Sequence, residues 1–172
     1  KQPDRLLEVV YPAYTLIDRE DCYDVTMMGY LNALRTGTTT VNNCFIWTDE
    51  IARAATDIGL RVDLAPCIHQ AIEHPDSKSI EDDLATAEIM IRKWHGTANG
   101  RIRYRIQPEI SFFCQEWVFE ACAKLANQYG VGLGTHIAED QASTSKAKKI
   151  WPEGELQKLH RTGFIGPNTL LS

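Results

Sequence analysis

The sequence predicts an α/β fold, and within that class a partial TIM-type (β/α)8 barrel of parallel strands. Short β-rich runs alternate with amphipathic helical patterns along the 172 residues, and this alternation implies right-handed crossovers between parallel strands. A complete barrel takes about 250 residues, whereas only five strands are expected here, the last at the very end of the chain. We therefore expect residues 1–172 to be one incomplete barrel domain, truncated at both ends, with roughly strands 2 to 6 and the intervening helices. A doubly wound open sheet is the competing architecture.

Each expected helix has apolar residues at helical spacing. Gly37, Gly59 and Gly130 follow three of the helices, at the position where a glycine most often ends one. Thr48 and Ser79 can cap two helices at their N-termini. The expected elements in chain order are a helix over 25–35, a strand over 38–41, a helix over 49–58, a strand over 61–66, a helix over 80–94, a strand over 101–106, a helix over 115–129, a strand over 131–137, a polar stretch around 143–145 without an assigned element, a short helix ending at Gly163 and a strand over 168–172.

The strand over 101–106 has the sequence RIRYRI, in which Arg101, Arg103 and Arg105 share one face. Strands covered by helices on both sides are usually apolar throughout. Either the arginine face points into a polar barrel interior, or this strand is less buried than its neighbours. The sequence leaves both possibilities open.

Composition and charge exclude several classes of protein. Eighteen Lys and Arg against 23 Asp and Glu give a net charge of −5, which argues against a nucleic-acid surface because such a surface needs clustered cations. No apolar run approaches the ~20 residues that span a bilayer, and no secretion signal opens the chain. The five cysteines are odd in number and lack CxxC spacing, so we expect neither a disulfide framework nor a zinc knuckle. A cytoplasmic protein with no nucleic-acid or membrane partner is the expectation.

Polar residues that follow the expected strands mark the candidate site, because the carboxyl ends of parallel strands meet at one mouth. His136 lies at the end of one strand, and Glu139 follows three residues later. Gln107 and Glu109 follow a second strand, and His69 follows a third. An imidazole at a strand tip can bind a metal, and a carboxylate in the next loop can take a proton from metal-activated water and return it to a leaving nitrogen.

Each of these candidates also has a purely structural interpretation. A His-x-x-Glu spacing is a weak signal, since a lone histidine at a strand end is more often hydrogen-bonded than bound to metal. A metal site needs three or four protein ligands, and the other four histidines supply no obvious set. His69 is more simply a loop histidine, and Gln107 and Glu109 suit turn chemistry as well as contacts with a polar ring or amide. The sequence has no phosphate-binding loop and no nucleophile elbow.

Four stretches of the sequence carry a family resemblance: RTGTTTV at 35–41, GLRV at 59–62, ANQYGV at 126–131 and THIAE at 135–139. Together they resemble the amidohydrolase superfamily, in the branch that contains atrazine chlorohydrolase, guanine deaminase and S-adenosylhomocysteine/methylthioadenosine deaminase. The first and last stretches, in this order, form a fairly specific pair. The resemblance runs from about Leu6 to the end of the chain.

The resemblance implies a metal-dependent (β/α)8 barrel with one divalent ion, zinc as the first choice and iron as the second. His136 corresponds to the family's metal-binding histidine on the fifth strand, and Glu139 to its proton-shuttling glutamate. The family's other ligands, an HxH motif, a later histidine and an aspartate, would fall outside the chain. Related deaminases often carry His or Arg in the region of Glu109, and an acid there would favour a donor-rich partner such as an amino-substituted ring.

The expected function is therefore that of a metal-dependent hydrolase that removes an amino or chloro group from a purine-, pyrimidine- or triazine-like ring. His136 is the expected metal ligand and Glu139 the expected catalytic residue. Gln107, Glu109 and His69 are the expected substrate contacts. The chain alone should be nearly inactive, because one imidazole holds a metal ion weakly, and its unpaired strand edges should favour a homo-oligomer. The alternatives are a non-catalytic doubly wound module that binds a small molecule or a partner, and a pseudoenzyme on the same barrel.

Overall fold

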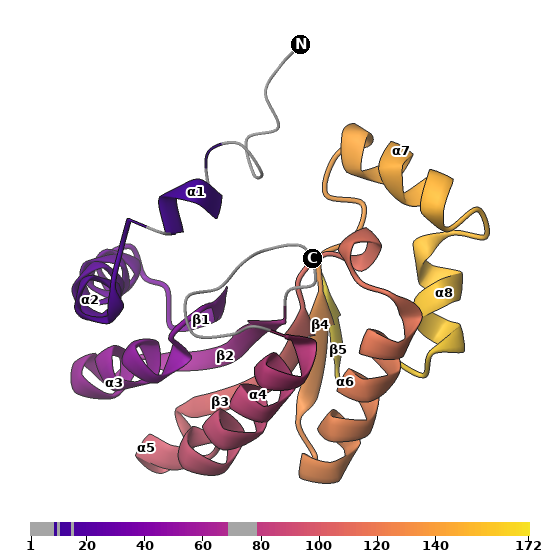
Figure 1. Cartoon of the computed structure of the whole chain (residues 1–172). Coiled ribbons are helices and arrows are strands. Elements are labelled where there is room, and N and C mark those ends of the chain that lie inside the picture. Colours follow the sequence, from indigo (N-terminus) through magenta and orange to yellow (C-terminus); the bar gives the residue numbers. More distant parts are fainter. Residues whose placement is uncertain (1–8, 10, 15, 69–78) are drawn as a thin grey trace.

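Figure 1 shows the computed structural model of the chain, which describes residues 9, 11–14, 16–68 and 79–172. The strands are β1 (Thr40–Phe45), β2 (Arg61–Ile68), β3 (Ile102–Pro108), β4 (Gly132–Thr135) and β5 (Thr169–Leu171). The helices are α1 (Tyr11–Tyr14), α2 (Arg19–Arg35), α3 (Thr48–Ile58), α4 (Ile80–Trp94), α5 (Thr97–Gly100), the 3-10 turn η2 (Ser111–Phe113), α6 (Glu116–Tyr129), α7 (Gln141–Ile150) and α8 (Glu155–Arg161).

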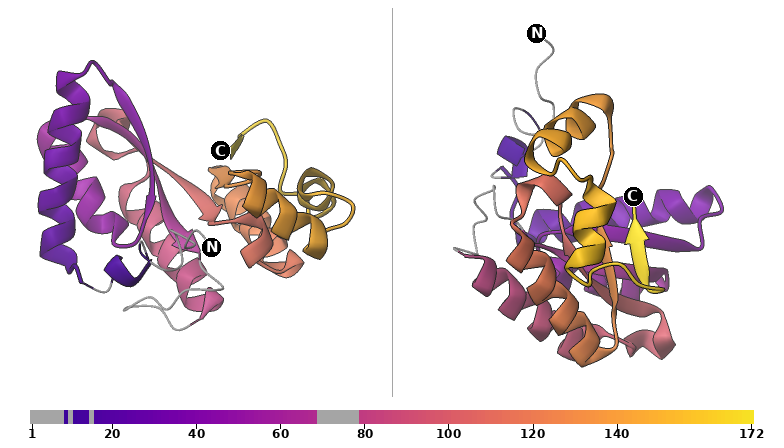
Figure 2. Two further views of the ribbon diagram at one scale, coloured as in Figure 1. Left: turned by 90° about the horizontal axis from the view of Figure 1, so that it is seen from above. Right: turned by 90° about the vertical axis from the view of Figure 1, so that its right-hand side faces the viewer.

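The five strands are parallel and lie side by side in chain order, β1-β2-β3-β4-β5. They curl into part of a barrel, and the helices lie along its outer side, as the two views in Figure 2 show. In a doubly wound sheet the strand order would reverse at a switch point. The sequential order therefore confirms the partial (β/α)8 barrel, and the doubly wound alternative is wrong.

The register between β2 and β3 decides which side chains meet the helices. Val62 lies opposite Ile102, and both are fully buried. One residue further along, Asp63 lies opposite Arg103. Because successive side chains of a strand point to opposite faces, the face toward the helices is apolar and the concave face is polar.

This arrangement answers the question that the RIRYRI stretch leaves open. Ile106 is fully buried in the core between the sheet and the helices. Arg103 and Arg105 lie on the concave face, where Arg105 forms an ion pair with Asp63 of β2. The arginine face therefore points into the barrel interior.

The helix ends follow the expected capping residues at most positions. Gly59 and Gly130 end α3 and α6 in the left-handed conformation, with φ of 81° and 64°. Ser79 caps α4 by accepting a hydrogen bond from the Asp82 N–H group. Thr48, in contrast, lies inside α3, and Trp47 occupies the N-cap position without a side-chain cap.

Two helical regions differ from the expectation. The helix expected over 25–35 begins at Arg19, because Asp18 and Asp21 form a reciprocal capping box there. The polar stretch around 143–145 belongs to α7, which Asp140 caps by accepting a hydrogen bond from the Ser143 N–H group. Capping makes a helix possible where few apolar residues signal one.

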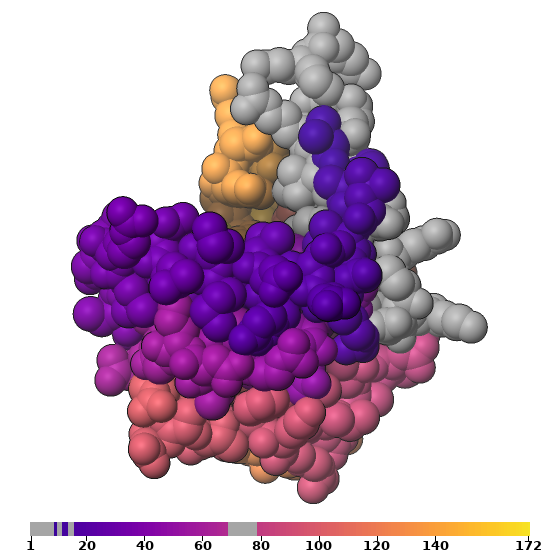
Figure 3. Space-filling model, turned by 90° about the vertical axis from the view of Figure 1, so that its left-hand side faces the viewer, coloured from indigo at the N-terminus to yellow at the C-terminus, as the bar shows by residue number. Residues whose placement is uncertain are grey.

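Helix α2 forms one side of the molecule (Figure 3). It buries Cys22 and Tyr30, whereas Leu31 and Leu34, which help to predict the helix, are 43% and 41% exposed. Helical spacing of apolar residues therefore identifies this helix but not its buried face. Within the ranges that the structure describes, no helix has the length and apolar character needed to cross a bilayer.

The burial of β3 gives a test of the fold. Replacing Ile106 by alanine removes a fully buried side chain, so the free energy of unfolding should fall by about 2–5 kcal/mol in urea unfolding of the intact protein. The matched control is Ile89→Ala on α4, since Ile89 is 58% exposed and its replacement should cost less than about 0.5 kcal/mol. Equal losses for the two variants would contradict the assigned faces.

Candidate functional site

The backbone of His136 is fixed by the chain that follows β3. The His136 N–H group donates to the Glu109 carbonyl oxygen at 2.9 Å, and the Ser111 N–H group donates to the His136 carbonyl oxygen at 3.2 Å. These bonds continue the parallel pairing of β3 and β4 beyond the end of both strands, through a bridge between Ile110 and His136. The imidazole therefore starts from a rigid position at the carboxyl end of the sheet.

Both ring nitrogens of His136 have polar neighbours on adjacent strands. The Nδ1 atom lies 2.8 Å from Oγ of Ser172, which follows β5. The Nε2 atom lies 3.4 Å from Nε2 of Gln107 on β3. When Nδ1 carries the proton and donates it to the Ser172 hydroxyl, Nε2 keeps its lone pair and accepts from the amide N–H group of Gln107.

Gln107 fills space on the concave face that β4 leaves empty. Its side chain is 1% exposed, and a Cβ atom at Gly134 would lie only 2.7 Å from its Oε1 atom and 3.2 Å from Cδ of Arg105. A Cβ atom at Gly132 would lie 3.0 Å from the carbonyl oxygen of Asn168. Gly134 thus lets the side chains of β3 lie across β4, and Gly132 lets the main chain before β5 approach it closely.

The Oε1 atom of Gln107 is a candidate substrate contact. It is buried, and none of the described residues donates a hydrogen bond to it. A buried acceptor without a donor costs free energy, so a ligand or water that donates to this atom would be favoured. The structure thus brings Gln107 and His136 together, as the sequence analysis expects of residues at one mouth.

Glu109 joins three strands through its backbone. Its N–H group donates to the carbonyl oxygen of Ile68 at 3.2 Å, while its own carbonyl oxygen accepts from the His136 N–H group and, at 3.3 Å, from the Thr135 hydroxyl. The residue is 9% exposed. Glu109 therefore lies at the same end of the sheet as Gln107 and His136.

Glu139 lies in the loop between β4 and α7, and it is exposed. Ala138, directly before it, has a φ of 48°, a left-handed conformation that is uncommon for a residue with a side chain. This residue turns the chain between His136 and Glu139. His69 lies outside the described residues, so its expected role as a substrate contact stays a prediction.

The described residues supply one candidate metal ligand. No group of three or more His, Cys, Asp and Glu side chains in the described part of the chain is arranged to hold a metal ion. His136 nevertheless has the surroundings of a ligand, because metal-binding histidines usually have their second ring nitrogen held by a hydrogen bond. The Ser172 hydroxyl supplies that hydrogen bond.

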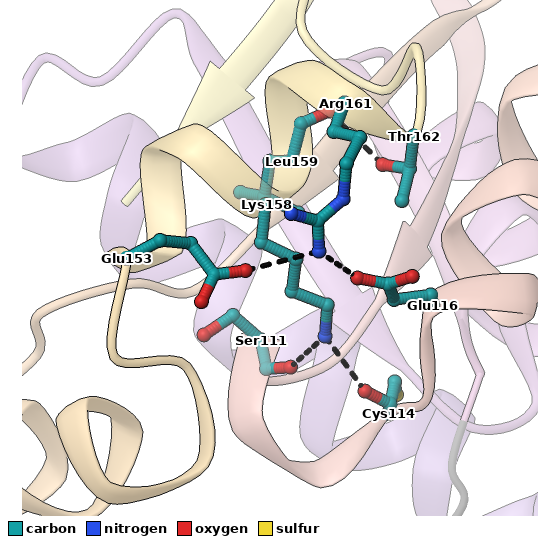
Figure 4. Close-up of polar contacts among 8 residues, drawn as sticks. All are labelled: Ser111, Cys114, Glu116, Glu153, Lys158, Leu159, Arg161 and Thr162. Atoms are coloured by element: carbon teal, nitrogen blue, oxygen red, sulfur yellow. Dashed lines mark hydrogen bonds and ion pairs between the residues drawn. The ribbon is translucent and has the colours of Figure 1, made fainter.

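A buried lysine holds the turn that follows β3 at Ser111 and Cys114 (Figure 4). Lys158 of α8 is fully buried, and its Nζ atom donates to the carbonyl oxygens of Ser111 at 3.2 Å and Cys114 at 2.9 Å. The same atom lies 3.2 Å from the ring centre of Trp151 and 4.5 Å from that of Phe119. Since the Ser111 N–H group binds His136, Lys158 connects α8 to the candidate site.

Surface ion pairs surround this lysine. Arg161 pairs with Glu116 and, at 3.0 Å, with Glu153, and the Ser111 hydroxyl donates to the Glu155 carboxylate. Burial is the main cause that lowers the pKa of Lys158 to about 8. The turn over Ser111–Phe113 is therefore held at two points of Ser111. Lys158 binds the main-chain carbonyl oxygen, and Glu155 binds the side-chain hydroxyl.

Two residues of this arrangement are absent from the sequence-based candidates. Ser172 ends the last strand, and the strand-end criterion that selects His136 could have selected it too. Lys158 gives no such signal, because a lysine in a short polar helix is typical of a solvated surface.

The chain matches the sequence model of the Amidohydrolase family over residues 1–171. The chain belongs to the amidohydrolase family. The family resemblance carried by the RTGTTTV and THIAE stretches is thereby confirmed. The chain spans about 37% of the length of the curated relatives that it matches.

The similar proteins include deaminases and a chlorohydrolase. A 5'-deoxyadenosine deaminase from Methanosarcina mazei is 30% identical over 161 residues, 94% of this chain and 37% of that protein. A crystal structure of an adenosine deaminase from Xanthomonas campestris with bound zinc matches with a TM-score of 0.89 at 21% identity. This match covers 97% of this chain and 38% of the deaminase chain. A mutant of atrazine chlorohydrolase TrzN from Arthrobacter aurescens TC1, complexed with zinc and atraton, matches with a TM-score of 0.81 at 19% identity, and this match covers 90% of this chain and 38% of the chlorohydrolase chain. The two structural matches show the amidohydrolase barrel fold.

The pKa of Lys158 gives a test of its burial. The unfolded chain keeps this lysine protonated up to about pH 10.5, whereas the folded chain releases the proton near pH 8. Between these values the unfolded state binds more protons, so the contribution of Lys158 to the free energy of unfolding should rise with pH. Urea unfolding of the intact protein from about pH 7 to about pH 10 should show this rise relative to a Lys158→Met variant. A constant difference between the two proteins would show that Lys158 has an ordinary pKa.

Proposed function

We propose that the intact protein is a metal-dependent hydrolase that deaminates a heteroaromatic ring, with an adenosine-like nucleoside as the first candidate substrate. The observation that carries the proposal is the imidazole of His136 at the mouth of the barrel, held at Nδ1 by Ser172 and facing Gln107 with Nε2. Membership in the amidohydrolase family and the deaminases among the similar proteins support it.

Zinc is the proposed metal, with iron as the second choice, and His136 is the proposed ligand within this chain. The two structural neighbours that contain zinc support zinc. When bound, such an ion lowers the pKa of a water molecule to about 7 and thereby makes a nucleophile available at neutral pH. A metal ion bound through Nε2 of His136 would leave the ring proton on Nδ1, from which it would be donated to the Ser172 hydroxyl.

Glu139 is the proposed general base and acid. As an exposed carboxylate in the loop after His136, it can accept a proton from the attacking water and return it to the nitrogen that leaves as ammonia. The left-handed conformation of Ala138 supports this role, because uncommon backbone conformations of this kind cluster at functional sites.

Gln107 and Glu109 are the proposed substrate contacts. The buried Oε1 atom of Gln107 can accept a hydrogen bond from an amino group or a ring N–H group. A carboxylate at position 109 also favours partners rich in donors. Both features favour an amino-substituted ring, and hence deamination, over a chlorinated ring, which offers fewer donors.

A cytoplasmic location also belongs to this proposal. All five cysteines have free thiols, and disulfide-free thiols are typical of a reducing compartment.

Metal analysis of the intact protein tests the role of His136. His136→Ala should remove most of the bound metal and abolish turnover, because it deletes a ligand. The matched control is His160→Ala, since His160 is exposed on α8 and its replacement should leave both properties unchanged. Glu139→Gln should keep the metal but lower kcat by about 10²- to 10⁴-fold. A His136→Ala variant with full metal content would overturn the proposed ligand, and a wild-type protein that binds no metal would indicate a pseudoenzyme.

Substrate competition tests the role of Glu109. Glu109→Gln should lower kcat/KM for an amino-substituted ring by about tenfold to a hundredfold, the worth of a hydrogen bond to a charged group. The loss should be smaller for a ring that carries a chloro group in place of the amino group. An unchanged ratio between the two substrates would refute the contact.

A further inference from the structure

Two cysteines lie together on the concave face of the sheet. Cys44 on β1 is opposite Ala65, and Cys67 is two residues further along β2, toward the mouth. Their Sγ atoms are 2.8 Å apart, although both thiols are free. Both residues are half-buried. The register of β1 and β2 therefore makes diagonal neighbours of two thiols that are 23 positions apart in the sequence.

The two thiols need little movement to become a bridge. A disulfide has an S–S length of about 2.05 Å, so the two sulfur atoms must approach by about 0.8 Å. Cys44 lies within the paired part of β1 and β2, and Cys67 lies one residue beyond the last pair of these strands, where β2 still pairs with β3.

Cys67 also lines a cavity of about 260 Å³. The cavity lies at the carboxyl ends of β1 and β2, beside Phe45 and Pro66, and extends to Met90 on α4. A molecule of the size of hydrogen peroxide fits in such a volume. The other three cysteines, Cys22, Cys114 and Cys122, are at most 3% exposed.

We propose that Cys44 and Cys67 are a modification site, at which a peroxide converts the two thiols into a disulfide that joins β1 to β2 at the mouth of the barrel. The two S–H bonds break and one S–S bond forms. The two electrons and two protons released pass to hydrogen peroxide, whose O–O bond breaks to give two molecules of water. A small organic disulfide can replace the peroxide, in which case it is reduced to two thiols.

The surroundings of Cys67 determine how fast this reaction runs. The hydrogen bond with Cys44 raises the pKa of the Cys67 thiol well above its usual value, and burial and the charges of Glu109 and Asp83 raise it further. Since the thiolate is the nucleophile, oxidation should be slow at neutral pH. Its rate should increase by about tenfold per pH unit as long as the pH is below the pKa of the attacking thiol.

Peptide mapping of the intact protein tests the proposal. After treatment with hydrogen peroxide and digestion without a reductant, mass spectrometry should find the peptides of Cys44 and Cys67 joined, with the loss of two hydrogen atoms. The reductant dithiothreitol should separate them. The bridge should form about tenfold faster at each higher pH unit between about pH 7 and about pH 9.

Serine variants supply the controls. Cys44→Ser and Cys67→Ser should each abolish the bridge, whereas Cys122→Ser should leave it unchanged, since Cys122 is fully buried on α6. Separate oxidation of the two thiols to sulfinic acids without a bridge would overturn the proposal. The proposal would also be overturned if, in the wild-type protein, disulfides among Cys22, Cys114 and Cys122 formed faster than the Cys44–Cys67 bridge.

Discussion

The parallel register of the strands controls both the core and the candidate site. Because side chains alternate between two faces, one register assigns Val62 and Ile102 to the core and Asp63 and Arg103 to the barrel interior. A shift by one residue would bury the arginines against the helices, at a large cost in free energy. The same alternation directs Gln107 and His136 toward each other from neighbouring strands. Core packing and site geometry are therefore two results of one constraint.

The site is held from outside the barrel as well as from within the sheet. The carbonyl oxygens of η2 accept from Lys158, and the N–H group of Ser111 donates to the strand tip that carries His136. A lysine among aromatic rings, with two carbonyl acceptors, loses little of its hydrogen bonding when it is buried. The outer helix α8 thus contributes to the position of an imidazole that it does not touch.

The sequence predicts the architecture well because the relevant signals are local. Gly59 and Gly130 mark the ends of two helices, and the strand ends locate His136, Gln107 and Glu109. The alternation of RIRYRI separates two faces of a strand, but the pairing with β2 decides which face is interior. Features that depend on neighbouring strands are missed, since no local pattern contains them. The Cys44–Cys67 contact arises only when two strands pair in one register. Likewise, Lys158 is buried because of how α8 packs against its neighbours, which no local pattern of the sequence contains. Helix α7 has one buried residue, Ala147, so its start is marked by the Asp140 cap and not by an apolar face.

The two glycines of β4 leave the inner wall of the barrel as bare main chain at that strand. The shape of the wall is consequently set by side chains that reach across from β3, chiefly Gln107 and Arg105. A single methyl group added at Gly134 would push the Gln107 amide aside without altering any residue that performs chemistry. The geometry of the proposed substrate contact at Gln107 thus depends on a position that has no side chain at all.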